Sequence, residues 1–161
     1  IFSSDVWYDI LKEKNFVKFE EIFQQNPNIV NSLRGAYGWT LLMKAVYEDR
    51  FDVFVHLMEY PQDFSLVSDN GQNILHYVGL VGTVRYLEKF DQQTIKMLIN
   101  GRTKQNETPL HKAALRNKHN IIRWLLAKGA NPELKDIYGQ RPDEQRCDGV
   151  TKEIFRSFRS S

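Results

Sequence analysis

The sequence predicts an all-α solenoid, in which antiparallel helix hairpins stack in a line and exposed loops connect them. Four similar stretches start at Gly38, Gly71, Asn106 and Gly139, which are 33, 35 and 33 residues apart. Within a period, apolar residues recur at the spacing of two short helices. Because one such unit buries too little apolar surface to fold alone, neighbouring units must stack and share a core.

The unit that starts at Asn106 shows each element most clearly. Thr108 can cap the first free backbone N–H groups, and Pro109 suits the first position of a helix. Asn117 lies where the chain turns, and Gly129 tolerates the backbone that ends a second helix. The inward stripes are Leu110, Ala113 and Ala114 in the first helix, then Ile121, Ile122, Leu125 and Leu126 in the second.

The stretch NETPLHKAALRNKHNIIRWLLAKGA resembles an ankyrin repeat, whose pattern runs G-x-T-P-L-H-x-A-A-x-x-G-H-x-x-I-V-x-L-L-L-x-x-G-A. It departs from the pattern at Asn106, which replaces the leading Gly, and at Asn117-Lys118, which replace Gly-His. Weaker copies start at Gly38 and Gly71. The resemblance implies a single ankyrin-repeat domain over residues 1–161, with exposed loops and β-turns. Its five units are an N-terminal cap (5–37), 38–70, 71–105, 106–138 and a truncated C-terminal cap (139–161).

Three units depart from the pattern. The N-terminal unit keeps only the apolar spacing, carried by Trp7, Ile10, Leu11, Phe19, Ile22 and Phe23. The unit over 71–105 has two extra residues, which predict a lengthened second helix or an added turn near residues 91–98. In the last unit we expect a first helix to start at RPDE (141–144) and a second helix over 151–158.

Residue types with catalytic potential have structural interpretations. His76 and His111 occupy the same repeat position, where the family's histidine bonds backbone groups and ties adjacent loops together. Cys147 has no recognisable base, no zinc-ligand spacing occurs, and Gly79 and Gly82 lack the lysine of a phosphate-binding loop. We therefore expect no catalytic residue, no cofactor, no metal and no enzyme activity in this region.

Composition and charge limit the classes of partner and the cellular compartment that we expect. The chain of 161 residues has a net charge of +2 and one cysteine, and no apolar run approaches the roughly 20 residues that span a bilayer. We expect no specific nucleic acid, no membrane insertion and no small-molecule substrate, and a monomer in the cytoplasm or nucleus. The start has neither Met nor a signal-peptide pattern, so we expect a piece of a longer chain.

The resemblance implies that another protein binds in a concave groove lined by the first helices and the loop tips. Repeat position selects Tyr37, Trp39, Lys44, Tyr47, Glu48, Gln72, Tyr77, Leu80, Val81, Lys104, Glu107, Lys112, Leu115, Arg116 and Tyr138. We expect the first half of the groove to expose an aromatic strip, unless these side chains pack on their own neighbours. Lys104, Lys112 and Arg116 make the other half basic, which suits an acidic partner segment.

The sequence favours a non-catalytic protein–protein interaction module. The alternative is a targeting or regulatory ankyrin domain of a larger multidomain enzyme, or of a bacterial effector that acts in the cytosol of a host cell. A third hypothesis, that the chain is itself an enzyme, requires paired acid and base groups in the groove, and none is apparent.

Overall fold

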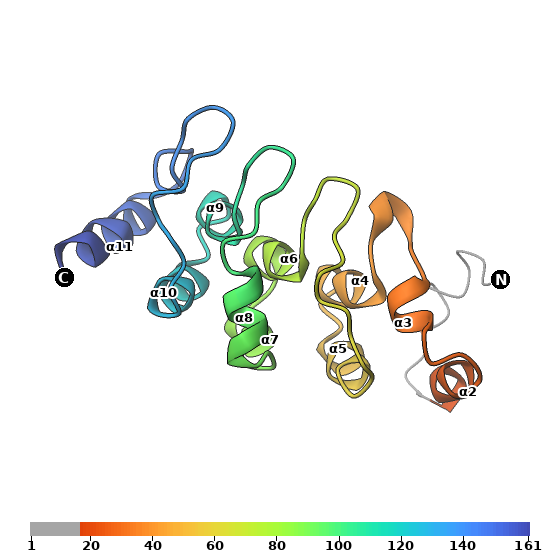
Figure 1. The fold of residues 1–161 in the computed structure, drawn as a ribbon. Helices are drawn as coiled ribbons and strands as arrows, with labels where there is room; N and C mark the ends of the chain where they lie inside the picture. Colours follow the sequence, from red (N-terminus) through yellow and green to blue (C-terminus); the bar gives the residue numbers. More distant parts are fainter. Residues whose placement is uncertain (1–16) are drawn as a thin grey trace.

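A computed structural model of the chain describes residues 17–161, which form a linear array of helix pairs (Figure 1). The expected contributions of Trp7, Ile10 and Leu11 lie outside the described residues. No strand occurs within residues 17–161, which confirms the all-α class. The elements are α2 (Val17–Gln25), α3 (Ile29–Ser32), η1 (Ala36–Gly38), α4 (Leu41–Tyr47), α5 (Phe51–Leu57), α6 (Ile74–Val81), α7 (Val84–Leu87), α8 (Gln92–Leu98), α9 (Pro109–Leu115), α10 (His119–Ala127) and α11 (Gly149–Ser160).

The helices form two rows, with α4, α6 and α9 in one row and α5, α7, α8 and α10 in the other (Figure 1). Long loops project from the row of first helices on the side away from the second helices. Helices α2 and α11 lie at opposite ends of the array. This arrangement is the predicted solenoid of helix hairpins.

Each first helix begins at a small polar residue in the same repeat position. The Thr40 hydroxyl accepts from the Met43 N–H, and the Thr108 hydroxyl accepts from the His111 N–H. In α6 the carboxamide of Asn73 has this role and accepts from two N–H groups. Because a cap satisfies N–H groups that have no partner within the helix, these residues fix where the helices start.

In two units the turn after the first helix contains a left-handed residue. Asp49 and Asn117 hold this place, each with a φ of 52°, and both residue types tolerate that conformation. The Asn117 side-chain oxygen also accepts from the Asp148 N–H at 2.7 Å and the Thr151 hydroxyl at 3.1 Å. The turn residue thereby joins its own unit to the next.

The core runs continuously through the stack. Among the described helices, α6 and α9 make the most extensive contact. Ala113 and Ala114 are fully buried on α9. On α6, a Cβ at Gly79 would lie 2.8 Å from the carbonyl oxygen of Pro109. Small residues on both helices therefore set how closely neighbouring units pack.

The unit over 71–105 contains a divided second helix. Helix α7 ends at Leu87, a turn occupies residues 88–91, and α8 starts at Gln92. The Asp91 carboxylate caps α8 by accepting from the Thr94 N–H at 2.8 Å. The break therefore lies just before the segment in which the extra residues predict an added turn.

The expectation that RPDE starts a helix is wrong. Residues 142–146 form turns, and α11 alone ends the array. The Glu144 carboxylate accepts from the Arg141 N–H at 2.8 Å, which closes a single turn. The Asp143 carboxylate binds the Arg159 guanidinium of α11 instead of supporting a helix start. Side-chain bonds thus offer this segment an alternative to a helix.

Replacing Gly79 by Ala should destabilise the protein by about 1–3 kcal/mol, because the added methyl would push α6 away from the α9 backbone. Urea denaturation measures the change in the free energy of unfolding. Gly149→Ala is the matched control, since a Cβ there meets nothing within 4 Å. Equal stability of the Gly79→Ala variant and the wild type would contradict this account of the packing.

Candidate protein-binding surface

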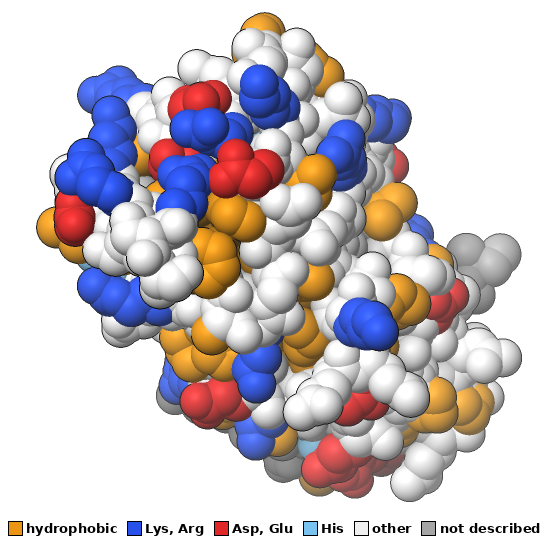
Figure 2. Space-filling model, turned by 60° about the vertical axis from the view of Figure 1, so that its left-hand side comes forward, with side chains coloured by type: hydrophobic (Ala, Val, Ile, Leu, Met, Phe, Trp, Pro, Cys, Tyr) orange, Lys and Arg blue, Asp and Glu red, His pale blue; other side chains and the backbone are white. Residues whose placement is uncertain are grey.

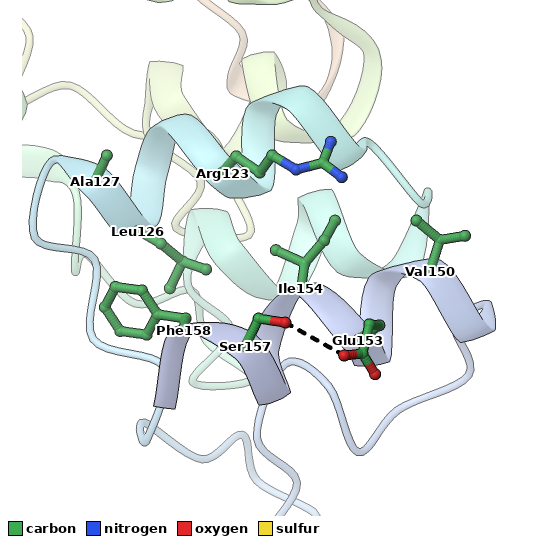
Figure 3. Close-up of a pocket in the computed structure, with 8 residues that line it drawn as sticks. All are labelled: Arg123, Leu126, Ala127, Val150, Glu153, Ile154, Ser157 and Phe158. Atoms are coloured by element: carbon green, nitrogen blue, oxygen red, sulfur yellow. Dashed lines mark hydrogen bonds between the residues drawn. The ribbon is translucent and has the colours of Figure 1, made fainter. Parts of the chain in front are cut away.

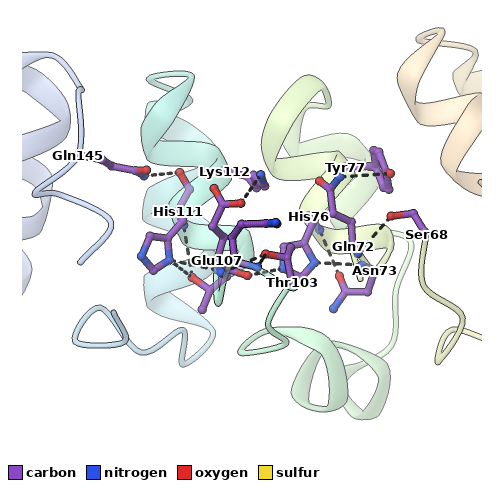
Figure 4. A network of polar contacts seen from close by, with 12 residues as sticks. Ser68, Gln72, Asn73, His76, Tyr77, Thr103, Glu107, His111, Lys112 and Gln145 are labelled. Carbon is purple, nitrogen blue, oxygen red and sulfur yellow. Dashed lines mark hydrogen bonds and ion pairs between the residues drawn. The ribbon is translucent and has the colours of Figure 1, made fainter. Parts of the chain in front are cut away.

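His76 and His111 hold the loops onto the helices (Figure 4). The Nδ1 atom of His111 accepts from the Thr108 N–H at 3.1 Å, so its Nε2 carries the proton and donates to the Gln140 carbonyl at 2.9 Å. His76 repeats this pattern between the Asn73 N–H and the Glu107 carbonyl. Each imidazole therefore bonds backbone groups of two successive units, which confirms its structural interpretation.

The loop tips also bond to each other. The Asp69 N–H donates to the Tyr37 carbonyl at 2.9 Å, the Lys104 N–H to the Asn70 carbonyl at 3.0 Å, and the Ile137 N–H to the Gln105 carbonyl at 3.0 Å. One backbone bond therefore joins each pair of neighbouring tips. Because both the tips and the helices are fixed, the surface between them is formed before any partner arrives.

Burial keeps both histidines neutral. It lowers the pKa of His76 to about 4, and it also lowers the pKa of His111. A protonated imidazole at either position could not accept from the backbone N–H that Nδ1 binds. Neither residue therefore has the protonation behaviour of a general acid or base near neutral pH.

Three aromatic side chains form a surface on the first half of the groove. The ring centroids of Tyr37 and Trp39 are 5.4 Å apart, and those of Trp39 and Tyr47 are 4.7 Å apart. Tyr37 is 72% exposed and Tyr47 is 47% exposed, whereas Trp39 is partly buried. The ammonium of Lys44 lies 5.2 Å from the Trp39 ring and bonds the Glu48 carboxylate at 2.6 Å. We call Tyr37, Trp39 and Tyr47 the aromatic surface.

The expectation that Tyr77 extends the exposed aromatic strip is wrong, because only 2% of Tyr77 is exposed. Its ring packs edge-on against Trp39 with centroids 5.7 Å apart, and its hydroxyl accepts a long hydrogen bond from Gln72. Met43 stands where the next two units have histidine, and its thioether cannot donate to the next loop. The Trp39–Tyr77 contact joins these two units instead.

Lys112 and Glu107, which we expected to contact a partner, bind each other instead. Lys112 is 9% exposed, and its ammonium binds the Glu107 carboxylate at 2.9 Å. The pair therefore joins α9 to the loop that precedes this helix (Figure 4). The remaining candidates split by exposure: Gln72, Leu80 and Val81 are partly buried, while Lys104, Leu115, Arg116 and Tyr138 are exposed.

The sequence interpretation missed an apolar pocket of about 560 Å³ between α10 and α11 (Figure 3). Val150 and Phe158 are 50% and 39% exposed at this pocket. The repeat of Val150, Ile154 and Phe158 at every fourth position of α11 was the signal that could have revealed it. The lining residues are Arg123, Leu126, Ala127, Val150, Glu153, Ile154, Ser157 and Phe158.

A second missed pocket, of about 510 Å³, lies where α9 ends and the chain approaches α11. It is lined by Leu115, Arg116, Asn117, Arg146, Cys147 and Asp148. Figure 2 brings the C-terminal end of the array toward the viewer and shows Lys and Arg side chains gathered on it, with carboxylates among them. No local sequence pattern indicates this pocket, because its two arginines belong to different units.

The described residues contain no cluster of metal ligands, and their single thiol is not activated. Within residues 17–161, no group of three or more His, Cys, Asp and Glu side chains could hold a metal ion. Burial raises the pKa of the Cys147 thiol, which is the opposite of what activates a nucleophile. In the same part of the chain, every helix is too short or too polar to cross a membrane.

Comparison with known proteins finds ankyrin repeats. Residues 42–136 match the family model described as ankyrin repeats (3 copies). The chain is 24% identical over 132 residues to target of rapamycin complex 2 subunit AVO2 of Saccharomyces cerevisiae, and the alignment covers 81% of this chain and 31% of that protein.

Two further relatives are similar over shorter stretches. The human transient receptor potential cation channel subfamily A member 1 is 27% identical over 82 residues, which are 51% of this chain and 7% of the channel. An ankyrin and IPT/TIG repeat-containing protein of Schizosaccharomyces pombe is 29% identical over 97 residues, which are 60% of this chain and 8% of that protein. The chain thus spans less than a third of the length of each of these relatives.

Acid should destabilise the protein through His76. The folded state binds the proton with a pKa of about 4 and the unfolded chain with a pKa near 6.5, so the unfolded state gains protons first. Stability that is complete above pH 6.5 should fall by about 3 kcal/mol as the pH drops to 4, at about 1.4 kcal/mol per pKa unit. Urea denaturation across this range should show that the free energy of unfolding depends less on pH in His76→Gln than in the wild type. The same pH dependence in both proteins would contradict the lowered pKa of His76.

Glu107→Gln should destabilise the protein by about 1–3 kcal/mol, because it leaves the buried ammonium of Lys112 without its counter-charge. The double variant Glu107→Gln/Lys112→Met should recover most of this loss, since it removes both charges. Denaturant unfolding of the two variants and the wild type makes the comparison. If the double variant is as unstable as Glu107→Gln, the unpaired charge of Lys112 is not the cause of the lost stability.

Proposed function

Because this chain belongs to the ankyrin-repeat family, we propose that it is a non-catalytic module that binds a partner protein through its concave groove and loop tips. Ankyrin repeats are generally protein-interaction modules and are typically non-catalytic, and this family-level role is the starting point. What supports a particular contact area here is the aromatic surface, since Tyr37 and Tyr47 expose large rings at fixed positions.

Tyrosine and tryptophan supply most of the binding energy in many protein interfaces, because they offer a large contact area at a low cost in side-chain entropy. Tyr37 also has a φ of 60°, in the left-handed region that non-glycine residues seldom adopt. The Tyr37 ring is exposed although the backbone conformation of this residue is uncommon. Lys44 and Glu48 add a paired charge beside the rings, which could orient a partner.

The fixed geometry of the groove supports the same proposal. Hydrogen bonds between neighbouring loop tips and from the two histidines leave little to be ordered upon binding. A preorganised surface loses less conformational entropy when a partner binds. The buried titratable groups His76 and His111 bond the backbone, and Lys112 bonds Glu107.

The relatives favour a second possibility for the whole protein. Each is more than twice as long as this chain, and one is named as a subunit of a complex and another as a cation channel. A targeting or regulatory role within a larger multidomain protein is therefore the alternative. We propose an intracellular location for the module, in keeping with its single cysteine.

Removal of the exposed rings should abolish partner capture. We expect Tyr37→Asn/Tyr47→Ala to weaken binding by at least about tenfold, because hot-spot side chains at interfaces are chiefly aromatic. Asn is chosen at position 37 because it tolerates a positive φ. The measurement is affinity capture from a cell lysate with the wild type and the variant as baits, followed by mass spectrometry.

Met97→Ala is the matched control, since Met97 is 57% exposed on α8 and lies outside the groove. It should retain every partner that the wild type captures. Both variants should keep the thermal transition of the wild type. Proteins that the aromatic variant still captures as well as the control does would argue against the aromatic surface as the binding site.

A further inference from the structure

We propose that the pocket between Arg116 and Arg146 binds an acidic segment of the partner protein in which carboxylates flank a large apolar side chain. This inference rests on the proposed function, since it assigns a second contact to the same partner. The pocket has a volume of about 510 Å³ and lies at the junction of units 106–138 and 139–161. We call it the arginine pocket.

The cations at the arginine pocket lack carboxylate partners. Arg116, Arg146 and Lys152 are exposed, and no carboxylate in residues 17–161 lies within 4.0 Å of their charged nitrogens. Three other arginines are paired: Arg50 binds Asp52, Arg141 binds Glu144 and Arg159 binds Asp143. A guanidinium is a planar fork of donors that matches a carboxylate, so two free arginines favour an acidic ligand.

The carboxylates nearest to the pocket are already occupied. Asp148 accepts from the Thr151 N–H at 2.7 Å and binds His119 Nε2 at 3.0 Å, and Asp143 binds Arg159 at 2.8 Å. These bonds hold the pKa of both carboxyl groups below the usual range. Both carboxyl groups therefore stay ionised near neutral pH. Arg159 balances the charge of Asp143, and the pocket lining keeps two arginines against the single carboxylate of Asp148, which leaves a net positive charge.

An apolar floor distinguishes this pocket from a plain basic patch. Leu115, which is 41% exposed, and the partly buried Cys147 line the pocket together with the two arginines. The floor is rigid because Asn117 bonds both the Asp148 N–H and the Thr151 hydroxyl. An apolar side chain that covers Leu115 would place flanking carboxylates at the two arginines.

A protein segment fits this site better than a nucleic acid or a lipid surface does. A duplex or a membrane needs an extended field of positive charge, whereas the net charge of the chain is only +2. In the last unit, Arg141, Arg156 and Arg159 are already paired with carboxylates. The two free arginines around one leucine match a short motif instead.

The test uses a fluorescein-labelled peptide in which Leu alternates with pairs of Asp and Glu, and fluorescence anisotropy measures its binding. The wild type should bind it with an affinity that falls as salt rises. We expect Arg116→Glu/Arg146→Glu to lose at least about tenfold in affinity, because both cations become repulsive. Replacing each Leu of the peptide by Ser should weaken binding to the wild type, as should Leu115→Ser in the protein.

Lys96→Glu/Arg102→Glu is the matched control, because it changes the net charge equally at exposed residues that do not line the pocket. It should bind the peptide within about twofold of the wild type, since distant exposed charges are screened. Cys147, the single cysteine of the chain, reports the location of the peptide. A bound peptide should slow the alkylation of its thiol by iodoacetamide.

Equal binding by the reversal variant and the control would overturn the proposal, as would unchanged alkylation of Cys147 at saturating peptide. Tighter binding of a single-stranded oligonucleotide or of phosphatidylserine vesicles than of the peptide would also overturn it. The aromatic variant Tyr37→Asn/Tyr47→Ala should bind the peptide like the wild type. Failure of the arginine pocket is thus measured apart from failure of the proposed function, which the capture experiment tests at the aromatic surface.

Discussion

The structure depends on the contact between one unit and the next, because no unit can bury its apolar helix faces alone. Helices α6 and α9 pack at the distance that Gly79 permits. The imidazoles of His76 and His111 then reach across the same junctions and bond loop carbonyls. Packing of helices and bonding of loops therefore act at the same place, so one junction fixes both the core and the surface.

A rigid stack suits recognition because it presents distant groups in constant geometry. The aromatic surface lies where the N-terminal unit meets the unit over 38–70, and the arginine pocket lies between the last two units. A partner that contacts both would have to extend along the array. Aromatic rings supply contact area, while unpaired arginines select for negative charge, so the two sites contribute affinity and specificity in different ways.

The departures from the repeat pattern shape the surface more than they disturb the core. Where Met43 replaces histidine, Tyr77 packs against Trp39 and joins the two units. Where two residues are added, the second helix divides into α7 and α8, and Asp91 caps the new helix. Tyr77 and Met43 stay buried at the first departure, and a cap bonds the new helix start at the second, so the array continues through both.

The sequence by itself determined the helical solenoid, the helix starts at Thr108 and Pro109, and the structural role of His111, because these follow from local spacing and capping. Tertiary structure alone decided which candidates face solvent. Tyr77 and Lys112 are buried because the neighbouring units cover them, and repeat position does not encode how far a neighbour's side chains reach. The RPDE turn, the apolar pocket at α11 and the arginine pocket likewise arise from bonds and contacts between segments far apart in the chain.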